Sequence, residues 1–390
     1  MSIRRVLKYP NILLGGFFAL MTLSIMKSAY SNIIESIKID LSLTYTQTGS
    51  LMSAYFVGYG LGQIPWGILV DKKGSRSIMS LSVLGVSFCT ILFGLAKTFR
   101  VALISRFFAG LLGAGIFVPG VRLISDWFNT EQRGTALGIL NIGGSVGLII
   151  ASWVAPFLSF GIGWRLSIEM VGAIGSLLAC VIWLLLKDNK KDLNTSEEAG
   201  PLPFTDYRFW ILAFTQFIRL GSYYTYIAWL PLVLKEDYGF NILATSTALS
   251  LFNIAGMAAN PLGGFLSDRY GEKPILISSF LFLGLLLLGL TQLSQALFIY
   301  SVIFLIGWLI NFVRSPSFTI IPRIFGAESA GSISGIQNTF ASLGALVLPF
   351  TLGYVKDYTL SYSIGWFVVL TLSILTSGGV LILKIHPNNS

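Results

Sequence analysis

Long apolar runs recur along this chain, and they constrain its fold more than any other feature. A helix needs about 20 apolar residues to cross the hydrocarbon core of a bilayer. Twelve stretches of the sequence meet that requirement, and they cover residues 11–35, 47–70, 77–96, 101–126, 134–158, 163–186, 209–234, 243–266, 274–292, 295–321, 330–354 and 362–384. Only 11% of the residues are charged, against about 25% in soluble domains. We therefore expect an all-α membrane protein with twelve transmembrane helices.

The longest polar stretch divides these spans into two equal groups. Residues 187–208 are rich in Lys, Asp, Glu, Asn, Ser and Pro, a composition typical of a linker. We expect an N-terminal six-helix bundle over residues 1–186, a cytoplasmic linker loop over 187–208 and a C-terminal six-helix bundle over 209–390. The first apolar run is longer than the apolar region of a signal peptide, so we interpret it as a retained span.

The net charge of +9 is explained by membrane topology rather than by a nucleic-acid partner. Loops on the cytoplasmic side of a membrane carry an excess of Lys and Arg. Placing both termini inside puts most of the Lys and Arg residues that lie in loops, tails and span ends on the inner side. We expect both termini to be cytoplasmic, in a bacterial or archaeal cytoplasmic membrane.

An internal repeat relates the two halves. The segment Gly67–Arg76 matches Gly264–Lys273 with a constant offset of 197 residues, and the same offset maps Pro119 onto Pro316. A constant offset over separate regions indicates two halves of the same topology, related by an axis along the membrane normal.

The two matched loops resemble the signature loop of the major facilitator superfamily, and Leu103–Gly113 is similar to its helix 4 motif. The resemblance covers nearly the whole chain. It implies two six-helix bundles and a gating role for polar residues of these motifs, namely Asp71, Arg76, Asp268, Lys273 and Arg106. The alternative for the loops is a tight polar turn that obeys the charge bias of inner loops.

A narrower resemblance concerns the anion:cation symporters, the organic-anion branch of that superfamily. Trp127–Gly138 and Trp229–Pro231 are similar to segments of this branch. Lys27 and Arg122 fall where the branch has cations, although Lys27 departs from the more usual Arg. The Gly-Pro pair of proton-driven drug antiporters is absent from the fifth span.

Five cations lie well inside the expected spans, where a charge is costly and usually faces a cavity. They are Lys27, Arg106, Arg122, Arg219 and Arg314, on the first, fourth, seventh and tenth spans. The resemblance implies that these four spans line the cavity. We predict that the cations bind an anionic substrate, because the planar guanidinium can hold a carboxylate with two hydrogen bonds. Arg106 could instead be structural, and Arg122 could extend to the cytoplasm.

Other residues complete the predicted site. Pro316 suggests that the tenth span is broken beside Arg314, and irregular backbone within a membrane lines a cavity. Uncharged side chains expected to contact substrate are Tyr30, Gln216, Tyr223 and Asn311. The tyrosine in the seventh span could belong instead to an interfacial aromatic belt.

Few acids are placed to carry a coupled proton. Glu35 and Glu169 are the candidates, although Glu169 lies four residues after Arg165, which predicts a local ion pair. No His, Cys and carboxylate cluster has metal-ligand spacing, and we expect neither a metal nor another cofactor. Cys89 and Cys180 both lie in apolar segments, which favours two buried thiols over a disulfide.

These observations predict a monomeric secondary transporter that moves a small organic anion by alternating access. Coupling to protons or sodium, or simple exchange, would supply the driving force. The alternatives are an exporter of drugs or metabolites and a transporter-like receptor that binds without moving its ligand. The spans contain no nucleophile, metal or acid–base cluster, so we do not expect an enzyme.

Overall fold

The computed structural model describes residues 8–189, 203–290 and 295–384. Within these ranges the side chains of residues 71, 130–131, 134, 287–290 and 327–332 are not described. The regular secondary structure of the described residues is entirely helical. The helices are α2 Pro10–Ser28, η1 Ser31–Ile33, α3 Ile34–Asp40, α4 Tyr45–Lys73, α5 Ser75–Gly94, α6 Phe99–Trp127, α7 Thr130–Ile162, α8 Trp164–Leu185, α9 Tyr207–Glu236, α10 Ile242–Tyr270, α11 Glu272–Leu290, α12 Ala296–Phe312, α13 Pro316–Phe325, α14 Ala327–Thr359 and α15 Tyr362–Ile382.

The chain divides into two compact units. Unit 1 comprises Met1–Leu43 and Ser50–Asp192, and unit 2 comprises Thr44–Gly49 and Leu193–Ser390. The first turn of α4 therefore groups with unit 2, whereas the rest of that helix groups with unit 1. Most of the predicted linker, residues 190–202, lies outside the described residues.

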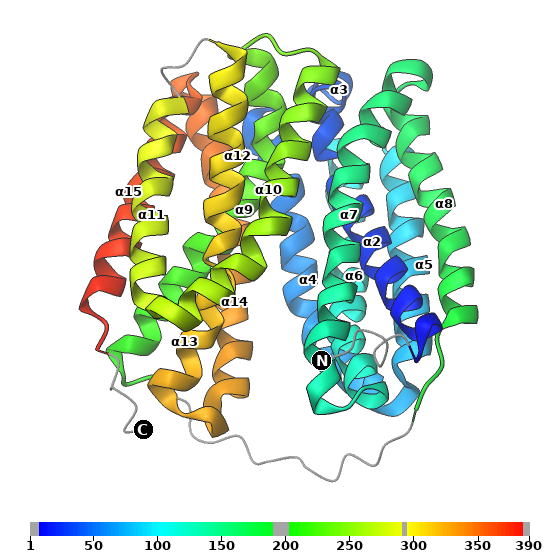
Figure 1. The fold of residues 1–390 in the computed structure, drawn as a ribbon. Helices are drawn as coiled ribbons and strands as arrows, with labels where there is room; N and C mark the ends of the chain where they lie inside the picture. Colours follow the sequence, from blue (N-terminus) through cyan, green and yellow to red (C-terminus); the bar gives the residue numbers. More distant parts are fainter. Residues whose placement is uncertain (1–7, 190–202, 291–294, 385–390) are drawn as a thin grey trace. The chain divides into compact units, whose positions relative to one another are not determined.

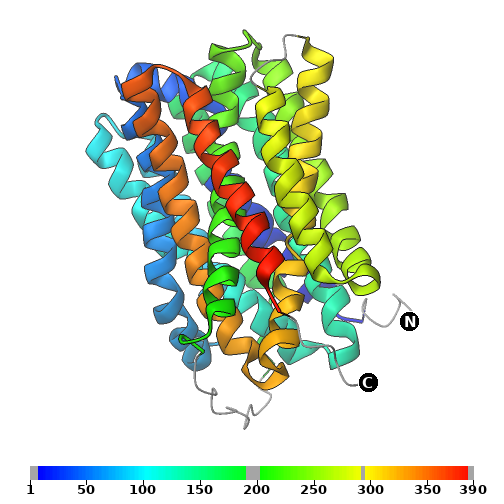
Figure 2. The same ribbon diagram turned by 90° about the vertical axis from the view of Figure 1, so that its left-hand side faces the viewer.

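The same helix pairs recur in both units. In unit 1, α2 packs along α7 and α5 lies between α6 and α8 (Figure 1). In unit 2, α9 packs along α14, α10 along α12 and α11 along α15. Figure 2 shows α15 in red, running diagonally beside α14. The pairing agrees with the internal repeat found in the sequence.

Two glycines at matched positions let helices approach closely in each unit. A Cβ atom at Gly110 of α6 would collide with the carbonyl oxygen of Tyr55 in α4. A Cβ atom at Gly307 of α12 would collide with the carbonyl oxygen of Phe252 in α10. Both the glycines and the carbonyls are 197 residues apart. Small residues allow such backbone contacts between membrane helices.

The signature loops also share one backbone conformation. Gly74 has φ 80° and ψ 159° before α5, and Gly271 has φ 85° and ψ 156°. Positive φ of this kind is accessible mainly to glycine. The repeat is thus preserved in backbone geometry as well as in residue identity.

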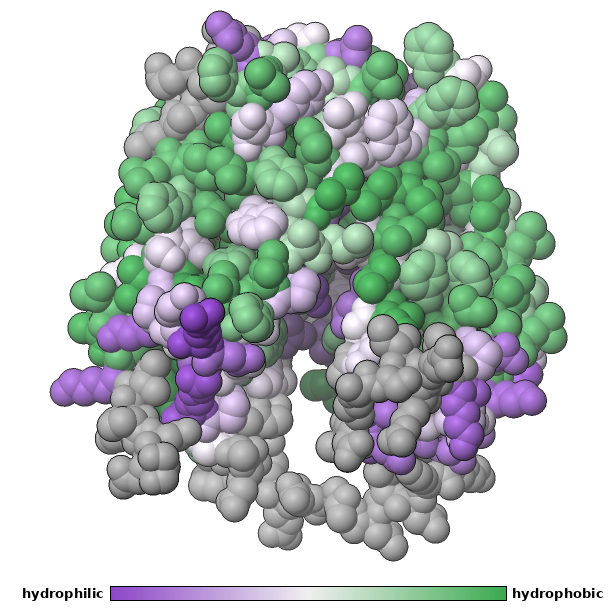
Figure 3. Space-filling model, in the orientation of Figure 1, coloured by the Kyte–Doolittle hydropathy of each residue, from purple (hydrophilic) through white to green (hydrophobic). Residues whose placement is uncertain are grey.

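The helices are long and apolar, as a bilayer requires. Among the described residues, nine helical segments meet both the length and the hydropathy needed to cross a membrane. Helices satisfy their backbone hydrogen bonds internally, which hydrocarbon demands. Apolar side chains cover the long faces in view, and polar ones gather toward the helix ends (Figure 3). Each of the twelve predicted spans is mainly helical over its described residues, with breaks in the first and the tenth.

The first span is not the continuous helix that the sequence predicted. Helix α2 ends at Ser28, and the chain resumes through η1 and α3. The side chains of Ser31 and Asn32 both donate to the Ser28 carbonyl, at 2.8 and 3.1 Å. These side chains satisfy an oxygen that the interrupted helix leaves without its usual partner.

The tenth span is broken as predicted. Helix α12 ends at Phe312 and α13 begins at Pro316. Proline lacks the N–H that an uninterrupted helix would need here. Arg314 therefore lies in a short non-helical segment between two helices.

Candidate functional site

The best-defined polar site in unit 2 begins at Arg219 on α9. Only 6% of this residue is exposed, and its Nε donates to Oε1 of Gln216 at 2.7 Å. The Nε2 atom of Gln216 in turn donates to the backbone and side-chain oxygens of Ser317, at 3.2 and 3.3 Å. Gln216 and Arg219 are one helical turn apart, so they share a face of α9. Gln216 thereby orients the guanidinium and ties α9 to the start of α13.

Arg314 brings a second positive charge to this site. Its charge acts on the Arg219 guanidinium, and both cations act on the hydroxyls of Tyr223 and Tyr224. The Arg219 guanidinium carbon also lies 5.5 Å from the centre of the Phe318 ring. Gln216, Arg219 and Tyr223 share α9, and Arg314 lies in the segment just before Ser317, to which Gln216 donates.

In the part of the chain that the structure describes, no carboxylate compensates these two charges. Among the described residues, neither Arg219 nor Arg314 forms an ion pair with Asp or Glu. The terminal nitrogens of Arg219 also lack a protein partner within the part of the chain that is described. A buried cation without a counter-charge is destabilising. The arrangement is therefore suited to an anion that supplies the missing charge.

The predicted site arginines of unit 1, in contrast, form hydrogen bonds or an ion pair with other residues of the protein. Arg106 is 4% exposed and donates to the carbonyls of Met26 and Lys27, at 3.4 and 3.1 Å. Its guanidinium lies 4.1 Å from the Tyr30 ring centre and 4.9 Å from that of Tyr55. These contacts hold the broken end of α2, where carbonyl oxygens need donors.

Two further predicted cations, Arg122 and Lys27, belong to unit 1. Arg122 is paired with Asp126 one turn later on α6, with Nε 3.8 Å from the carboxylate. Lys27 is half-buried in the last turn of α2. Asn311, predicted to contact substrate, donates to the Gly307 carbonyl at 2.8 Å and packs against Gly256 of α10.

The signature loops hold their polar residues in different ways. The side chain of Asp71 lies outside the described residues. Arg76 donates from Nε to the Trp183 carbonyl at 2.8 Å, whereas Asp268 is exposed near the end of α10. Lys273 donates to the Leu383 carbonyl at 3.0 Å.

An ion pair beside the second loop was missed by the sequence reasoning. Glu272, only 1% exposed, starts α11 and lies 3.0 Å from Nε of Arg323 at the end of α13. These two residues are 51 positions apart, and only the position of Glu272 within the repeated loop could have drawn attention to it.

The predicted ion pair between Arg165 and Glu169 is wrong. Arg165 instead lies 2.6 Å from Asp40 at the end of α3, and it also donates to the carbonyls of Gly94 and Ala96. The break in the first span places Asp40 within its reach. Glu169 is half-buried and packs against Gly94, and Glu35 is half-buried on α3.

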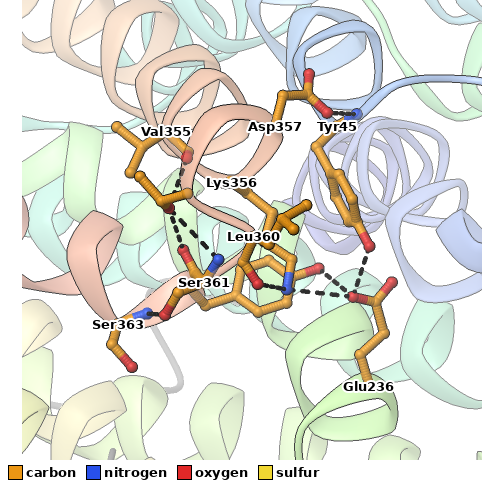
Figure 4. Close-up of polar contacts among 10 residues, drawn as sticks. Tyr45, Glu236, Val355, Lys356, Asp357, Leu360, Ser361 and Ser363 are labelled. Carbon is orange, nitrogen blue, oxygen red and sulfur yellow. Dashed lines mark hydrogen bonds and ion pairs between the residues drawn. The ribbon is translucent and has the colours of Figure 1, made fainter.

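A second polar cluster, also missed, holds the first turn of α4 within unit 2 (Figure 4). Asp357 accepts from the backbone N–H groups of Tyr45 and Thr46, at 2.8 and 2.7 Å, and from the Thr46 hydroxyl at 2.5 Å. The hydroxyl of Tyr45 donates to Glu236 at 2.9 Å. Asp357 therefore caps the N-terminus of α4 with a carboxylate.

Lys356 lies at the centre of the same cluster. It is 7% exposed, 3.7 Å from Glu236 and 3.8 Å from the centre of the Tyr362 ring. Its Nζ also donates to the Leu360 carbonyl at 3.1 Å. Sequence proximity could not reveal this cluster, because its members come from α4, α9, α14 and α15.

The described residues contain no group of three or more His, Cys, Asp or Glu side chains that could hold a metal ion. Polar chemistry at the candidate site therefore rests on guanidinium, amide and phenol groups. Such groups bind and orient an anion.

Comparison with known families agrees with the helical arrangement and the repeated loops. The model of the Major Facilitator Superfamily matches residues 12–349. The chain belongs to this superfamily. Its members and the relatives found here are transporters, not enzymes, so the chain is a membrane transporter.

Several relatives carry names that specify an anion. The chain is 26% identical to the probable L-galactonate transporter of Escherichia coli (strain K12), over 97% of this chain and 89% of the relative. It is 28% identical to a probable galactarate/D-glucarate transporter of Bacillus subtilis (strain 168), over 84% and 81%. It is 27% identical to a probable sulfoacetate transporter of Cupriavidus necator, over 90% and 87%.

A solved structure shares the fold. It is a bacterial homologue of the human lysosomal transporter Spinster, with a TM-score of 0.75 and 19% identity, covering 96% of this chain and 95% of the other. At this identity the likeness supports the fold alone.

Proposed function

We propose that this superfamily member moves a small organic anion across the cytoplasmic membrane by alternating access. The observation that carries the proposal is the pair of arginines in unit 2, Arg219 and Arg314, which have no carboxylate partner among the described residues. A carboxylate bound between them would supply the missing negative charge. The names of relatives that specify galactonate, glucarate and sulfoacetate support this choice of substrate class.

In the proposed site, some residues supply charge and others position the substrate or the charged group. Arg219 offers its terminal nitrogens for a bidentate contact with one carboxylate. Gln216 holds Arg219 in place through the bond to Nε, and Tyr223 contributes a hydroxyl for the remainder of the substrate. Four further residues remain proposed substrate contacts of lower rank, because each already interacts with other groups of the protein. They are Lys27, Arg122, Tyr30 and Asn311.

Transport further requires a gate and a driving force. We assign the gate to the signature loops, with Asp71, Arg76, Asp268 and Lys273, and assign Arg106 to hold the broken first span. Glu35 and Glu169 are the proposed proton carriers. We propose that both termini are cytoplasmic, which the charge bias of the loops supports.

Ligand-dependent stabilisation tests the binding site directly. A ligand at 100 times its Kd stabilises the folded state by about 2.7 kcal/mol, which raises the melting temperature. The melting temperature of the purified protein is therefore measured with L-galactonate, D-glucarate, sulfoacetate and neutral galactose. We expect at least one carboxylate, and not galactose, to raise the melting temperature of the wild type. Arg219→Gln and Arg314→Gln should lose this increase, whereas Arg100→Gln, an exposed arginine at the start of α6, should keep it.

Flux measurements test transport and its coupling. Liposomes containing the protein should accumulate the stabilising anion, and imposed proton and sodium gradients identify the driving ion. Binding of the anion without any flux would favour a receptor and contradict the proposal. Equal stabilisation of the wild type and both arginine variants would place the site elsewhere.

A further inference from the structure

Unit 1 carries a groove between α5 and α8 that is lined by none of the proposed substrate contacts. Its volume is about 490 Å³, within the range of about 300–1,000 Å³ typical of ligand cavities. Residues along its wall include Lys73, Ser77, Ser80, Leu81, Cys180 and Trp183. The groove is open on the side of the helices that bears exposed leucines.

Cations gather at one end of this groove. Lys72 and Lys73 close α4 and are exposed. The Arg76 guanidinium lies 4.2 Å from the centre of the Trp183 ring and uses only its Nε for a hydrogen bond, to the Trp183 carbonyl. Its terminal nitrogens have no protein partner among the described residues.

One described acid lies near these cations. Asp188 accepts from the backbone N–H of Arg76 at 2.9 Å, and it is exposed, as is the neighbouring Lys187. The described side chains at this end thus carry more positive than negative charge. An anionic group would be attracted there.

The wall of the groove becomes less polar along α5. Lys73 lies at one end of the wall, Ser77 and Ser80 follow within about two turns, and Leu81 and Leu84 come next along α5. This sequence of charge, hydroxyl and hydrocarbon matches the phosphate, ester and acyl regions of a phospholipid. Basic pockets between membrane helices are known to bind anionic lipid head groups.

A buried hydroxyl supports the same ligand. Ser80 is only 6% exposed, and its Oγ has no hydrogen-bond partner among the described residues. Leaving such a group unpaired is unfavourable. An ester oxygen of a lipid in the groove would accept from it.

We propose that this groove binds one anionic phospholipid, with its phosphate at Lys73 and Arg76 and an acyl chain between α5 and α8. The lipid would fill a surface that the protein leaves hollow and would bring the α4 end, α5 and α8 under one head group. The proposal is independent of the transported substrate.

Lipid retention provides the test. Protein is purified from nanodiscs of phosphatidylcholine and phosphatidylglycerol, and the lipids that remain bound are counted by native mass spectrometry. We expect one phosphatidylglycerol, enriched over its share in the nanodisc. Lys73→Gln combined with Arg76→Gln should lower that enrichment by about fivefold for each cation removed, whereas Arg100→Gln should not change it.

A second pair of variants tests the groove rather than the charge. Cys180 is exposed on the groove wall, so Cys180→Phe should release the bound lipid, while Cys180→Ser should retain it. Melting temperatures close to that of the wild type confirm that the variants are folded. The proposal would be overturned if the lipids retained by the wild type had the same composition as the nanodisc. It would also be overturned if the double variant retained as much phosphatidylglycerol as the wild type. Inorganic phosphate that stabilises the delipidated protein as well as phosphatidylglycerol does would also overturn it.

Discussion

Replacing Asp357 should loosen the first turn of α4 while leaving the rest of the helix intact. The first N–H groups of a helix have no partner within it, yet those of Tyr45 and Thr46 are held by this carboxylate at 2.8 and 2.7 Å. Loss of a capping side chain costs about 0.5–2 kcal/mol. Two N–H groups and one hydroxyl depend on a charged acceptor here, which places Asp357→Ala near the upper end, about 2 kcal/mol.

Hydrogen–deuterium exchange measures this local effect. A change of about 1.4 kcal/mol is a factor of ten in an equilibrium constant, so about 2 kcal/mol corresponds to roughly thirtyfold faster exchange at Tyr45 and Thr46. Asp357→Asn keeps one acceptor oxygen and should show a smaller increase. Asp237→Ala, at a nearby acid that directly follows α9, serves as the control and should leave exchange at both amides unchanged. Exchange at the wild-type rate in Asp357→Ala would refute the capping argument.

Three further predictions concern packing, charge and pH. Gly307→Ala should destabilise the protein by about 1–3 kcal/mol, because the added Cβ meets the Phe252 carbonyl, whereas Gly335→Ala, with open space around it, should not lower the melting temperature. Arg323→Gln should destabilise the protein by about 3–5 kcal/mol, because it leaves the buried Glu272 carboxylate unpaired. Glu272→Gln should cost less, because the Arg323 guanidinium that it leaves unpaired is half-exposed. Equal losses of unfolding free energy in chemical denaturation would contradict this. Hydrogen bonds from Arg208 lower the pKa of Asp206 at the start of α9. The stabilisation of the fold by ionised Asp206 is therefore present above the ordinary Asp pKa of about 3.9 and is lost as pH falls through the lower pKa of the folded state. Asp206→Asn should lower the melting temperature at neutral pH, and the difference from wild type should shrink in acid.

The spans and the repeat could be predicted because they depend on local composition and on a fixed spacing. Apolar length alone located the helices to within a few residues, and Pro316 indicated the break before α13. The break after Ser28 could not be predicted in the same way. It depends on donors from Asn32 nearby and on Arg106, which is distant in sequence.

The candidate site was predictable only as a set of charges. The sequence placed Arg219 and Arg314 inside spans, but it did not show which cations have protein partners. Arg106 donates to two carbonyls of α2 and Arg122 is paired with Asp126, so the proposed anion site centres on unit 2. The carbonyls that Arg106 reaches are about 80 residues away, so this contact depends on tertiary packing, which local sequence does not specify.

The placement of the first α4 turn within unit 2 has a consequence for how the chain can be cut. The backbone passes between the units at Leu43, at Gly49 and again at Asp192. A break in the region of residues 190–202 would therefore not give one fragment per unit, because the N-terminal fragment would still carry the turn that Asp357 holds. Two separately expressed fragments divided there should therefore reassemble, because the first turn of α4 in the N-terminal fragment binds to unit 2 of the C-terminal fragment.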